Sequence, residues 1–173
     1  MKKILINLVH PNFDESIVNK KILEGVSEFK NITINNLYLK YPDFKIDIKK
    51  EQDLLLENDV IIFQFPMYWF SSPSLLKEWF DLVLEPGFAY GKDYKLKGKD
   101  FCIAVSCGAE KKDYVSDNEN MMTNLLYPFY GTSLYIQMNY KEPFITYSAE
   151  KGLSEETLNK YNQEYLEYIK KLF

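Results

Sequence analysis

Three short segments carry the residues best suited to bind a ligand, and each directly follows an apolar run. The first holds His10, the only histidine, and Ser16 at the start of a helical pattern. The second places the bulky side chains of Met67–Phe70 after Pro66, and the third is the small-residue segment Ser106–Glu110. A helix start attracts phosphate, and small residues let a ligand approach the backbone. The aromatic segment suits a planar ligand that needs stacking.

Each segment also has a purely structural interpretation. Ser16 can simply cap a helix, and His10 at a strand end can form a local hydrogen bond. The residues Met67–Phe70 can belong to the core, since aromatic side chains are usually structural. Residues in a Pro-flanked loop, however, are more often kept for binding. The segment Ser106–Glu110 can be a plain turn after a strand.

Length and composition indicate one ordinary globular domain. The chain has 173 residues, of which 46% are hydrophobic and 27% charged, and we expect a single domain over residues 1–173. The net charge of −4 argues against nucleic acid as the main partner. No apolar run approaches a membrane span, and the run after Met1-Lys2-Lys3 is too short for a cleaved secretory signal. We therefore expect a cytoplasmic protein.

The two cysteines, Cys102 and Cys107, are expected to be free thiols. Five residues along one extended strand span about 16 Å, which exceeds the roughly 7 Å Cα separation that a disulfide allows. With a single histidine and no Cys/His cluster, the sequence also gives no indication of a metal site.

Strands and helices are predicted to alternate along the chain. Short apolar or alternating runs predict strands at Lys3–Val9, Asn31–Leu39, Val60–Phe63, Phe101–Val105 and Ser133–Met138. Helical spacing predicts a helix after Ser16 that buries Val18, Ile22, Val26 and Phe29, a helix over Lys49–Asn58, a helix with Ser72 as N-cap and Pro73 in its first position, a helix over Asn118–Tyr130, and a closing helix capped by Ser154.

This order predicts an α/β fold, a single-domain, doubly wound, five-stranded parallel sheet with helices on both faces. In the flavodoxin-like strand order 2-1-3-4-5, the loops after the first, third and fourth strands converge on one edge, where FMN binds. The three ligand-binding segments follow these same three strands. Their convergence favours the functional interpretation over the structural ones.

The chain resembles the flavodoxin-like NAD(P)H:quinone oxidoreductases over nearly its whole length. It is most similar to the small bacterial branch that includes general stress proteins and the ancillary oxidoreductase of glutathione-regulated potassium efflux. The resemblance is most specific in LYLKYPDFKIDI, in QFPMYWFSSPSLLKEWFDLVLEPGFAYG and in the His-Pro…Ser-x-x-Asn pattern of residues 10 to 19.

The resemblance implies a set of site residues. Those that would hold the flavin phosphate are His10, Ser16, Ile17, Val18 and Asn19. Those that would flank the isoalloxazine are Pro66, Met67, Tyr68, Trp69 and Phe70. Those that would lie along the ring are Ser106, Cys107, Gly108 and Ala109, with Tyr114 beyond them as a proton donor or orienting group. The family commonly has Thr-Thr-Gly-Gly where this chain has Ser-Cys-Gly-Ala, and a histidine where it has Tyr147.

The resemblance also implies the chemistry. The cofactor would be FMN, with FAD less favoured, and NADH or NADPH would give hydride to flavin N5 before a quinone takes its place. A homodimer is expected, with surfaces at Tyr41–Ile48 and Phe88–Tyr94, since 16% aromatic residues exceeds the need of one core. The alternatives are a flavodoxin-type electron carrier, whose Thr/Ser-rich phosphate loop is lacking here, and a regulatory ancillary subunit of a potassium-efflux transporter.

Overall fold

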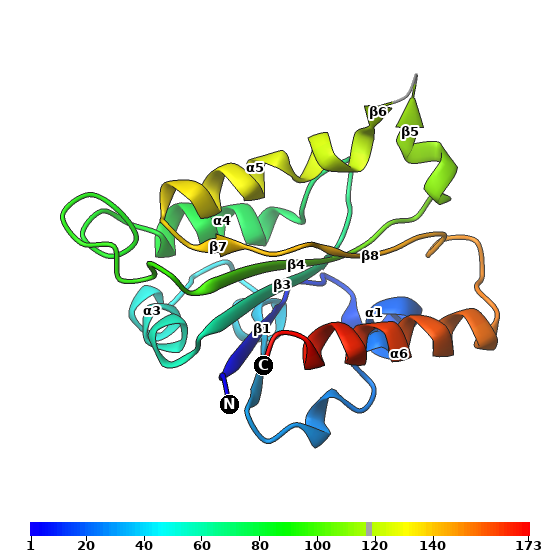
Figure 1. Cartoon of the computed structure of the whole chain (residues 1–173), viewed down its shortest axis with the longest axis horizontal. Helices are drawn as coiled ribbons and strands as arrows, with labels where there is room; N and C mark the ends of the chain where they lie inside the picture. The colour runs from blue at the N-terminus through cyan, green and yellow to red at the C-terminus, as the bar shows by residue number, and fades with distance from the viewer. Residues whose placement is uncertain (117–118) are drawn as a thin grey trace.

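The computed structural model describes residues 1–116 and 119–173 and has three layers, with a parallel sheet between two layers of helices (Figure 1). The sheet consists of β1 (Ile4–Leu8), β2 (Ile32–Asn36), β3 (Val60–Pro66), β4 (Asp100–Ser106), β7 (Asn139–Tyr140) and β8 (Phe144–Thr146). All of these strands pair in parallel, in the order β2-β1-β3-β4-β7, and β8 also pairs with β4. The segments β7 and β8 share the fifth position, so the predicted order 2-1-3-4-5 is confirmed.

The helices cover both faces of this sheet (Figure 1). They are α1 (Ile17–Leu23), α2 (Leu37–Lys40), α3 (Ile48–Glu57), α4 (Ser74–Val83), α5 (Met121–Tyr135) and α6 (Glu155–Lys170). The three-residue or four-residue 3-10 turns are η1 (Phe13–Glu15), η2 (Val26–Glu28) and η3 (Lys111–Tyr114), and a small antiparallel pair joins β5 (Val115–Ser116) to β6 (Glu119–Asn120). No described helix is long and apolar enough to cross a membrane.

Two apolar clusters hold the layers together. One lies between the sheet and α3, α4 and α5, and the other lies between the sheet and α1 and α6. Every residue of β1, β3 and β4 is buried, as expected for strands that are covered on both faces. The first cluster also encloses the Glu51 carboxylate, which accepts hydrogen bonds from Asn35 Nδ2 (2.7 Å), Tyr41 OH (2.8 Å) and Trp79 Nε1 (3.0 Å). These donors compensate the burial of the charge.

Local capping explains several helix boundaries. Ser16 and Ser154 are N-caps, as predicted, and each accepts a hydrogen bond from a backbone N–H in the first turn. The prediction for α4 was wrong by one position, because Pro73 is the N-cap and Ser74 begins the helix. The helix after Ser16 is shorter than predicted, because Gly25 has a left-handed φ of 78° and interrupts it before η2.

The predictions at the ends of two strands were wrong. The strand predicted over Asn31–Leu39 ends at Asn36, whose side chain accepts a hydrogen bond from Leu39 N and starts α2. No strand forms over Ser133–Met138, because its first half is the end of α5, which continues to Tyr135, and β7 begins only at Asn139. The helix predicted from Asn118 begins at Met121, and Asn118 itself lies outside the described residues.

Candidate functional site

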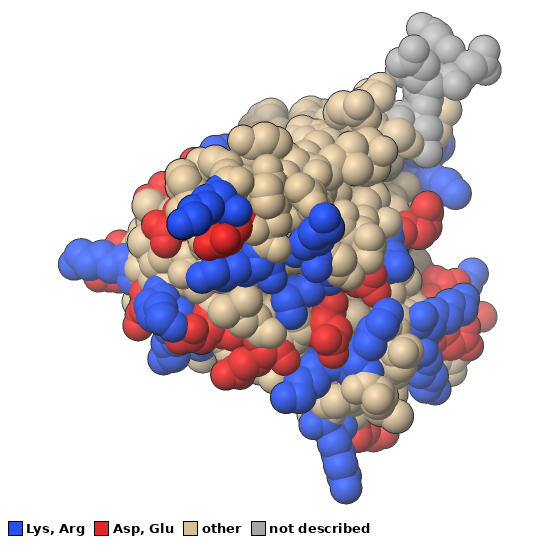
Figure 2. Space-filling model, turned by 60° about the vertical axis from the view of Figure 1, so that its left-hand side comes forward, with Lys and Arg blue, Asp and Glu red and all other residues tan. Residues whose placement is uncertain are grey.

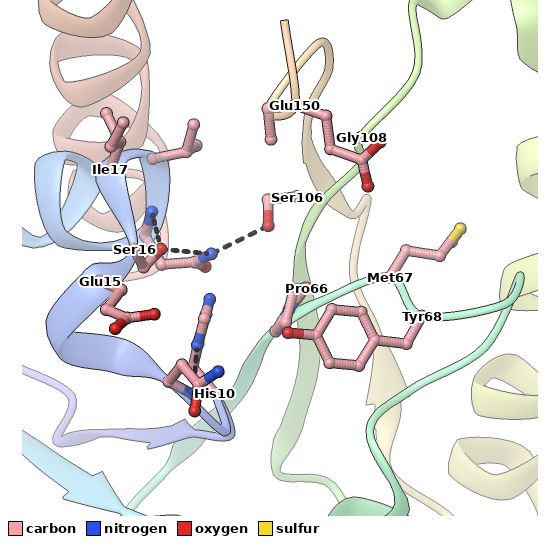
Figure 3. Close-up of a pocket in the computed structure, with 14 residues that line it drawn as sticks. His10, Glu15, Ser16, Ile17, Pro66, Met67, Tyr68, Ser106, Gly108 and Glu150 are labelled. Carbon is pink, nitrogen blue, oxygen red and sulfur yellow. Dashed lines mark hydrogen bonds between the residues drawn. The ribbon is translucent and has the colours of Figure 1, made fainter. Parts of the chain in front are cut away.

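A cavity of about 320 Å³ opens where the carboxyl ends of β1, β3 and β4 meet the start of α1 (Figure 3). Ten of its fourteen lining residues are ones that the sequence predicted, namely His10, Ser16, Ile17, Val18, Asn19, Pro66, Met67, Tyr68, Ser106 and Gly108. The other four, which the sequence did not predict, are Asn12, Glu15, Ala149 and Glu150. The predicted segments therefore meet at one edge of the sheet.

The start of α1 presents hydrogen-bond donors to this cavity. Ser16 Oγ accepts from the backbone N–H of Asn19 (3.2 Å) and from its Nδ2 (3.3 Å). Because both bonds use lone pairs of the oxygen, the Ser16 hydroxyl proton remains to donate. The backbone N–H groups of Ile17 and Val18, in the first turn, have no partner within the helix. These groups suit a ligand that is rich in acceptor oxygens.

A buried polar network fixes the floor of the cavity. Asn19 Nδ2 donates to Ser106 Oγ (2.9 Å), and Gln64 Nε2 donates to the backbone oxygen and Oδ1 of Asn19 (both 3.3 Å). Tyr165 OH, from α6, donates to Gln64 Oε1 (3.0 Å). Asn19, Gln64, Ser106 and Tyr165 are all buried. The network therefore holds α1, β3, β4 and α6 in one arrangement around the site.

His10 is a neutral donor in this site. Its Nδ1 accepts a 3.2 Å hydrogen bond from the backbone N–H of Asn12, so the ring proton lies on Nε2. Only 8% of the residue is exposed, and this burial lowers the pKa of His10 because the charged form loses solvation. Figure 3 shows His10 and Ser16 on one side of the cavity and Ser106 and Tyr68 on the other.

The aromatic segment forms a tight hairpin beside the cavity. The backbones of Tyr68 and Ser71 exchange hydrogen bonds of 2.9 and 3.0 Å, and Trp69 and Phe70 between them have φ values of 47° and 61°. Two positive φ angles define a type I′ turn, which normally favours Asn-Gly. A non-glycine residue in this region costs about 1–3 kcal/mol. The strained turn directs bulky rings outward, and Trp69 is 94% exposed.

Tyr68 is therefore the only ring of the aromatic segment that lines the cavity, since Trp69 and Phe70 lie outside the lining. The exposure of Trp69 excludes the interpretation of this residue as part of the core. The predicted roles of Trp69 and Phe70 toward a ligand remain predictions.

The third predicted segment contributes mainly Ser106 and Gly108. Cys107 is fully buried beside the cavity wall, where burial raises the pKa of its thiol to about 12 despite a hydrogen bond to Tyr114. Tyr114 is 7% exposed, and its ring centroid lies 5.8 Å from that of Tyr147. Cys107, Ala109 and Tyr114 do not line the cavity, and the proposed proton-donating role of Tyr114 stays a prediction.

A further wall comes from the loop after β8. Ser148, Ala149 and Glu150 donate backbone hydrogen bonds to the carbonyls of Ala109, Cys107 and Gly108 respectively, at 2.8, 3.0 and 3.3 Å. This docking brings Ala149 and Glu150 to the cavity. The sequence analysis missed them because it assigned the last strand to Ser133–Met138. An apolar Phe144–Thr146 run next to a proline was the available signal.

The chain matches a family model and resembles known proteins over most of its length. The model of a family described as flavodoxin-like fold matches residues 2–169. An uncharacterized NAD(P)H oxidoreductase, YrkL of Bacillus subtilis, is 43% identical over 97% of this chain and 98% of its own length. KefG, a glutathione-regulated potassium-efflux system ancillary protein of Cronobacter sakazakii, is 41% identical over 88% of this chain and 85% of its own.

A solved structure is also closely similar. General stress protein 14 of Treponema denticola, in complex with FMN, superposes with a TM-score of 0.91 at 36% identity and covers 99% of both chains. The backbone of this chain thus follows the same overall fold as that structure.

Proposed function

Because the chain belongs to the flavodoxin-like family, we propose that it is an NAD(P)H oxidoreductase that binds FMN in the cavity at the start of α1. The observation that carries the proposal is the set of donors facing this cavity: the Ser16 hydroxyl, the His10 Nε2–H and the first-turn N–H groups of α1. A phosphate monoester has the acceptor oxygens that such a set requires.

The residues present fit FMN. The phosphate is assigned to Ser16, Ile17, Val18 and Asn19 with His10, and the ribityl hydroxyls to the region of Ser106. The ring system is assigned to the space between the Met67–Tyr68 backbone and the wall at Gly108. FMN is preferred to FAD, because the cavity offers one helix start for one phosphate group.

When bound, FMN supplies two-electron chemistry, with hydride from NADH or NADPH received at N5 and passed to a quinone-like acceptor in a ping-pong exchange. The chain itself supplies orientation and shielding. Tyr68 lies against the site, while Trp69 and Phe70 project next to it and offer stacking surfaces to the nicotinamide and the acceptor. The hydrogen bond between Tyr114 and Cys107 supports Tyr114 as a group that orients the segment after β4.

The proposal is tested with purified protein under anaerobic conditions. The flavin released from it, or taken up on reconstitution, should be FMN by absorbance and mass. NADH or NADPH should bleach the bound flavin within the time of a stopped-flow experiment, and a quinone should restore its colour. A protein that binds FMN but does not oxidise either nicotinamide would instead be an electron carrier of flavodoxin type. A protein that takes up no flavin would contradict the proposal.

We further propose that the protein forms a homodimer through α5. This helix contains no charged residue, whereas a helix exposed on one face normally carries charged residues there. Yet Tyr127, Leu134 and Tyr135 are each more than half exposed. A groove of about 660 Å³ runs between α4 and α5, and Figure 2 shows that charged side chains are sparse over this upper part of the molecule.

The dimer surfaces predicted from the sequence, at Tyr41–Ile48 and Phe88–Tyr94, support this α5 contact only in part. Tyr41 and Phe88 are buried within the subunit, so they cannot supply the main contact. Tyr90 packs against Tyr135, with ring centroids 5.2 Å apart, and extends the α5 surface. Light scattering should give twice the mass of the chain, and Leu134→Lys should reduce this to one chain. A monomeric wild type would contradict the dimer.

The similarity to KefG supports a second assignment of the same apolar surface, in which it contacts a potassium-efflux transporter. The two assignments are distinguished by co-purification with a membrane fraction. Retention on vesicles that contain the transporter, with loss on Leu134→Lys, would favour the ancillary role. A stable dimer that does not bind such vesicles would favour an enzyme that acts without a transporter.

A further inference from the structure

We propose that Glu150 lowers the reduction potential of the bound flavin by placing a carboxylate on the wall of the ring site. This inference rests on the proposed FMN function and concerns a residue that sets how strongly the flavin donates electrons. Ala149 and Glu150 are the two cavity residues that lie outside the three ligand-binding segments.

The Glu150 side chain lies directly over Gly108. A Cβ atom built on Gly108 would stand 2.5 Å from Cδ of Glu150, 2.6 Å from its Oε1 and 2.9 Å from its Cγ. The absence of a side chain at Gly108 is therefore what allows the carboxylate to occupy this place. The backbone hydrogen bond from Glu150 N to Gly108 O (3.3 Å) holds the two residues together. Figure 3 shows the side chain extending along this wall, remote from Ser16.

The charge of Glu150 is not neutralised by its lysine neighbours. Lys151 Nζ lies 2.6 Å from Glu110 Oε1, and Lys112 Nζ lies 2.7 Å from Glu110 Oε2. Within the described parts of the chain, no lysine forms an ion pair with Glu150. Its field also extends behind the wall, since burial, the nearby Cys107 and Glu150 together raise the pKa of Tyr114.

A carboxylate at this wall acts differently on the two oxidation states of a flavin. The oxidised ring is neutral, whereas the two-electron reduced ring at neutral pH carries a negative charge. Like charges repel each other, and because Glu150 is exposed, water screens this repulsion and keeps it modest. Glu150 therefore weakens the binding of reduced FMN relative to oxidised FMN, which lowers the potential and makes the bound flavin a stronger reductant toward the acceptor.

The cavity contains a natural control for this effect. Glu15 also lines it, but it precedes Ser16 at the end assigned to the phosphate. The phosphate has the same charge in both oxidation states of the flavin. Neutralising Glu15 should therefore change the affinities of oxidised and reduced FMN by the same factor, whereas neutralising Glu150 should change their ratio.

The experiment compares wild type, Glu150→Gln, Glu150→Asp, Glu15→Gln and, outside the cavity, Glu156→Gln. Dissociation constants are measured for oxidised FMN and for dithionite-reduced FMN, and the midpoint potential is measured by equilibration with a redox dye. We expect Glu150→Gln to tighten reduced FMN relative to oxidised FMN by about three- to tenfold, which for a two-electron couple raises the potential by about 14–30 mV. The other variants should keep the wild-type ratio.

The outcomes separate the inference from the proposed function. Failure of the wild type to bind FMN would overturn both. Binding of FMN with an unchanged ratio in Glu150→Gln would overturn the role of Glu150 alone. An equal change of the ratio in Glu15→Gln would also overturn it, since the effect would then not depend on position. Urea unfolding of the flavin-free variants shows whether each is folded. Glu150→Asp keeps the carboxylate, so it shows whether a change seen in Glu150→Gln comes from loss of the charge or from a change in the loop.

Discussion

Asn19 Nδ2 donates a 2.9 Å hydrogen bond to Ser106 Oγ, although the two residues lie 87 positions apart in the chain. The bond joins the start of α1 to the carboxyl end of β4 and is buried. Through it, the segment assigned to the phosphate and the residue assigned to the ribityl hydroxyls keep a constant separation. The cavity is thus organised before any ligand arrives, which reduces the ordering cost of binding.

Asn19→Ala should weaken FMN binding at least tenfold, or by about 1.4 kcal/mol, because it releases Ser16 and Ser106 together. Asn162→Ala is the matched control. Its Nδ2 donates to the carbonyls of Lys21 (2.9 Å) and Glu24 (2.8 Å) at the other end of α1, so it should reduce stability without changing affinity. Calorimetric titration of both folded variants with FMN measures this difference. Equal losses of affinity would show that Asn19 only stabilises the helix.

Trp69→Ala should leave the stability of the flavin-free protein within about 0.5 kcal/mol of wild type, because the residue is 94% exposed. Loss of an aromatic contact beside a planar ligand should lower FMN affinity or NADH oxidation by up to about tenfold. Urea unfolding and steady-state kinetics check the two expectations. A large loss of stability with unchanged kinetics would contradict the proposed role.

Exchange of Trp69-Phe70 for Asn-Gly tests the strain in the same turn. Asn-Gly is the preferred type I′ pair, and removal of the two positive-φ aromatic residues should stabilise the flavin-free protein by about 1–3 kcal/mol. The same exchange should reduce turnover. Unchanged or lower stability would show that the turn is not strained.

Trp79→Phe should behave in the opposite way to Trp69→Ala. Trp79 is fully buried, and its Nε1 donates a 3.0 Å hydrogen bond to the Glu51 carboxylate. The substitution leaves this buried charge with one donor fewer, so stability should fall by about 1–3 kcal/mol. FMN affinity per folded molecule should not change. Denaturant unfolding with parallel FMN titration measures both quantities, and a selective loss of affinity would contradict this assignment.

His10 should make the protein less stable in mild acid. Burial lowers its pKa below the ordinary value of 6.5, so above pH 6.5 the residue is neutral in both the folded and the unfolded state. As the pH falls below 6.5, the unfolded state binds the proton first, and the stability of the folded state decreases until His10 itself is protonated. His10→Gln should flatten this part of the stability profile. An NMR titration of the single imidazole that gives a pKa at or above 6.5 would contradict the prediction.

Much of the fold could be predicted, because each of its central strands coincides with a short, largely apolar run in the sequence. The runs predicted at Lys3–Val9, Val60–Phe63 and Phe101–Val105 correspond to the strands β1, β3 and β4, which are buried throughout. Strand order then determined which loops meet. Strand order and loop chemistry thus indicated the three segments at this edge, and the family resemblance supplied the individual residues, ten of which line the cavity.

The parts that the sequence did not reveal depend on contacts between distant segments. The α5 helix contains no charged residue that would mark a solvent face, so the sequence of its last turn shows no helical periodicity and resembles a strand. The fifth strand is divided into two short pieces around Pro143. Glu150 reaches the cavity only because the loop after β8 docks on Gly108, and no local pattern encodes that docking.

The start of α1 is proposed to recognise the phosphate of FMN. The most direct test is calorimetric titration of the flavin-free protein with FMN and with riboflavin, which lacks the phosphate. Loss of the hydrogen bonds to a charged phosphate should weaken riboflavin binding by about 100-fold relative to FMN, or about 2.7 kcal/mol, and Ser16→Ala should narrow that difference. Equal affinities for FMN and riboflavin, or no binding of either, would contradict the account.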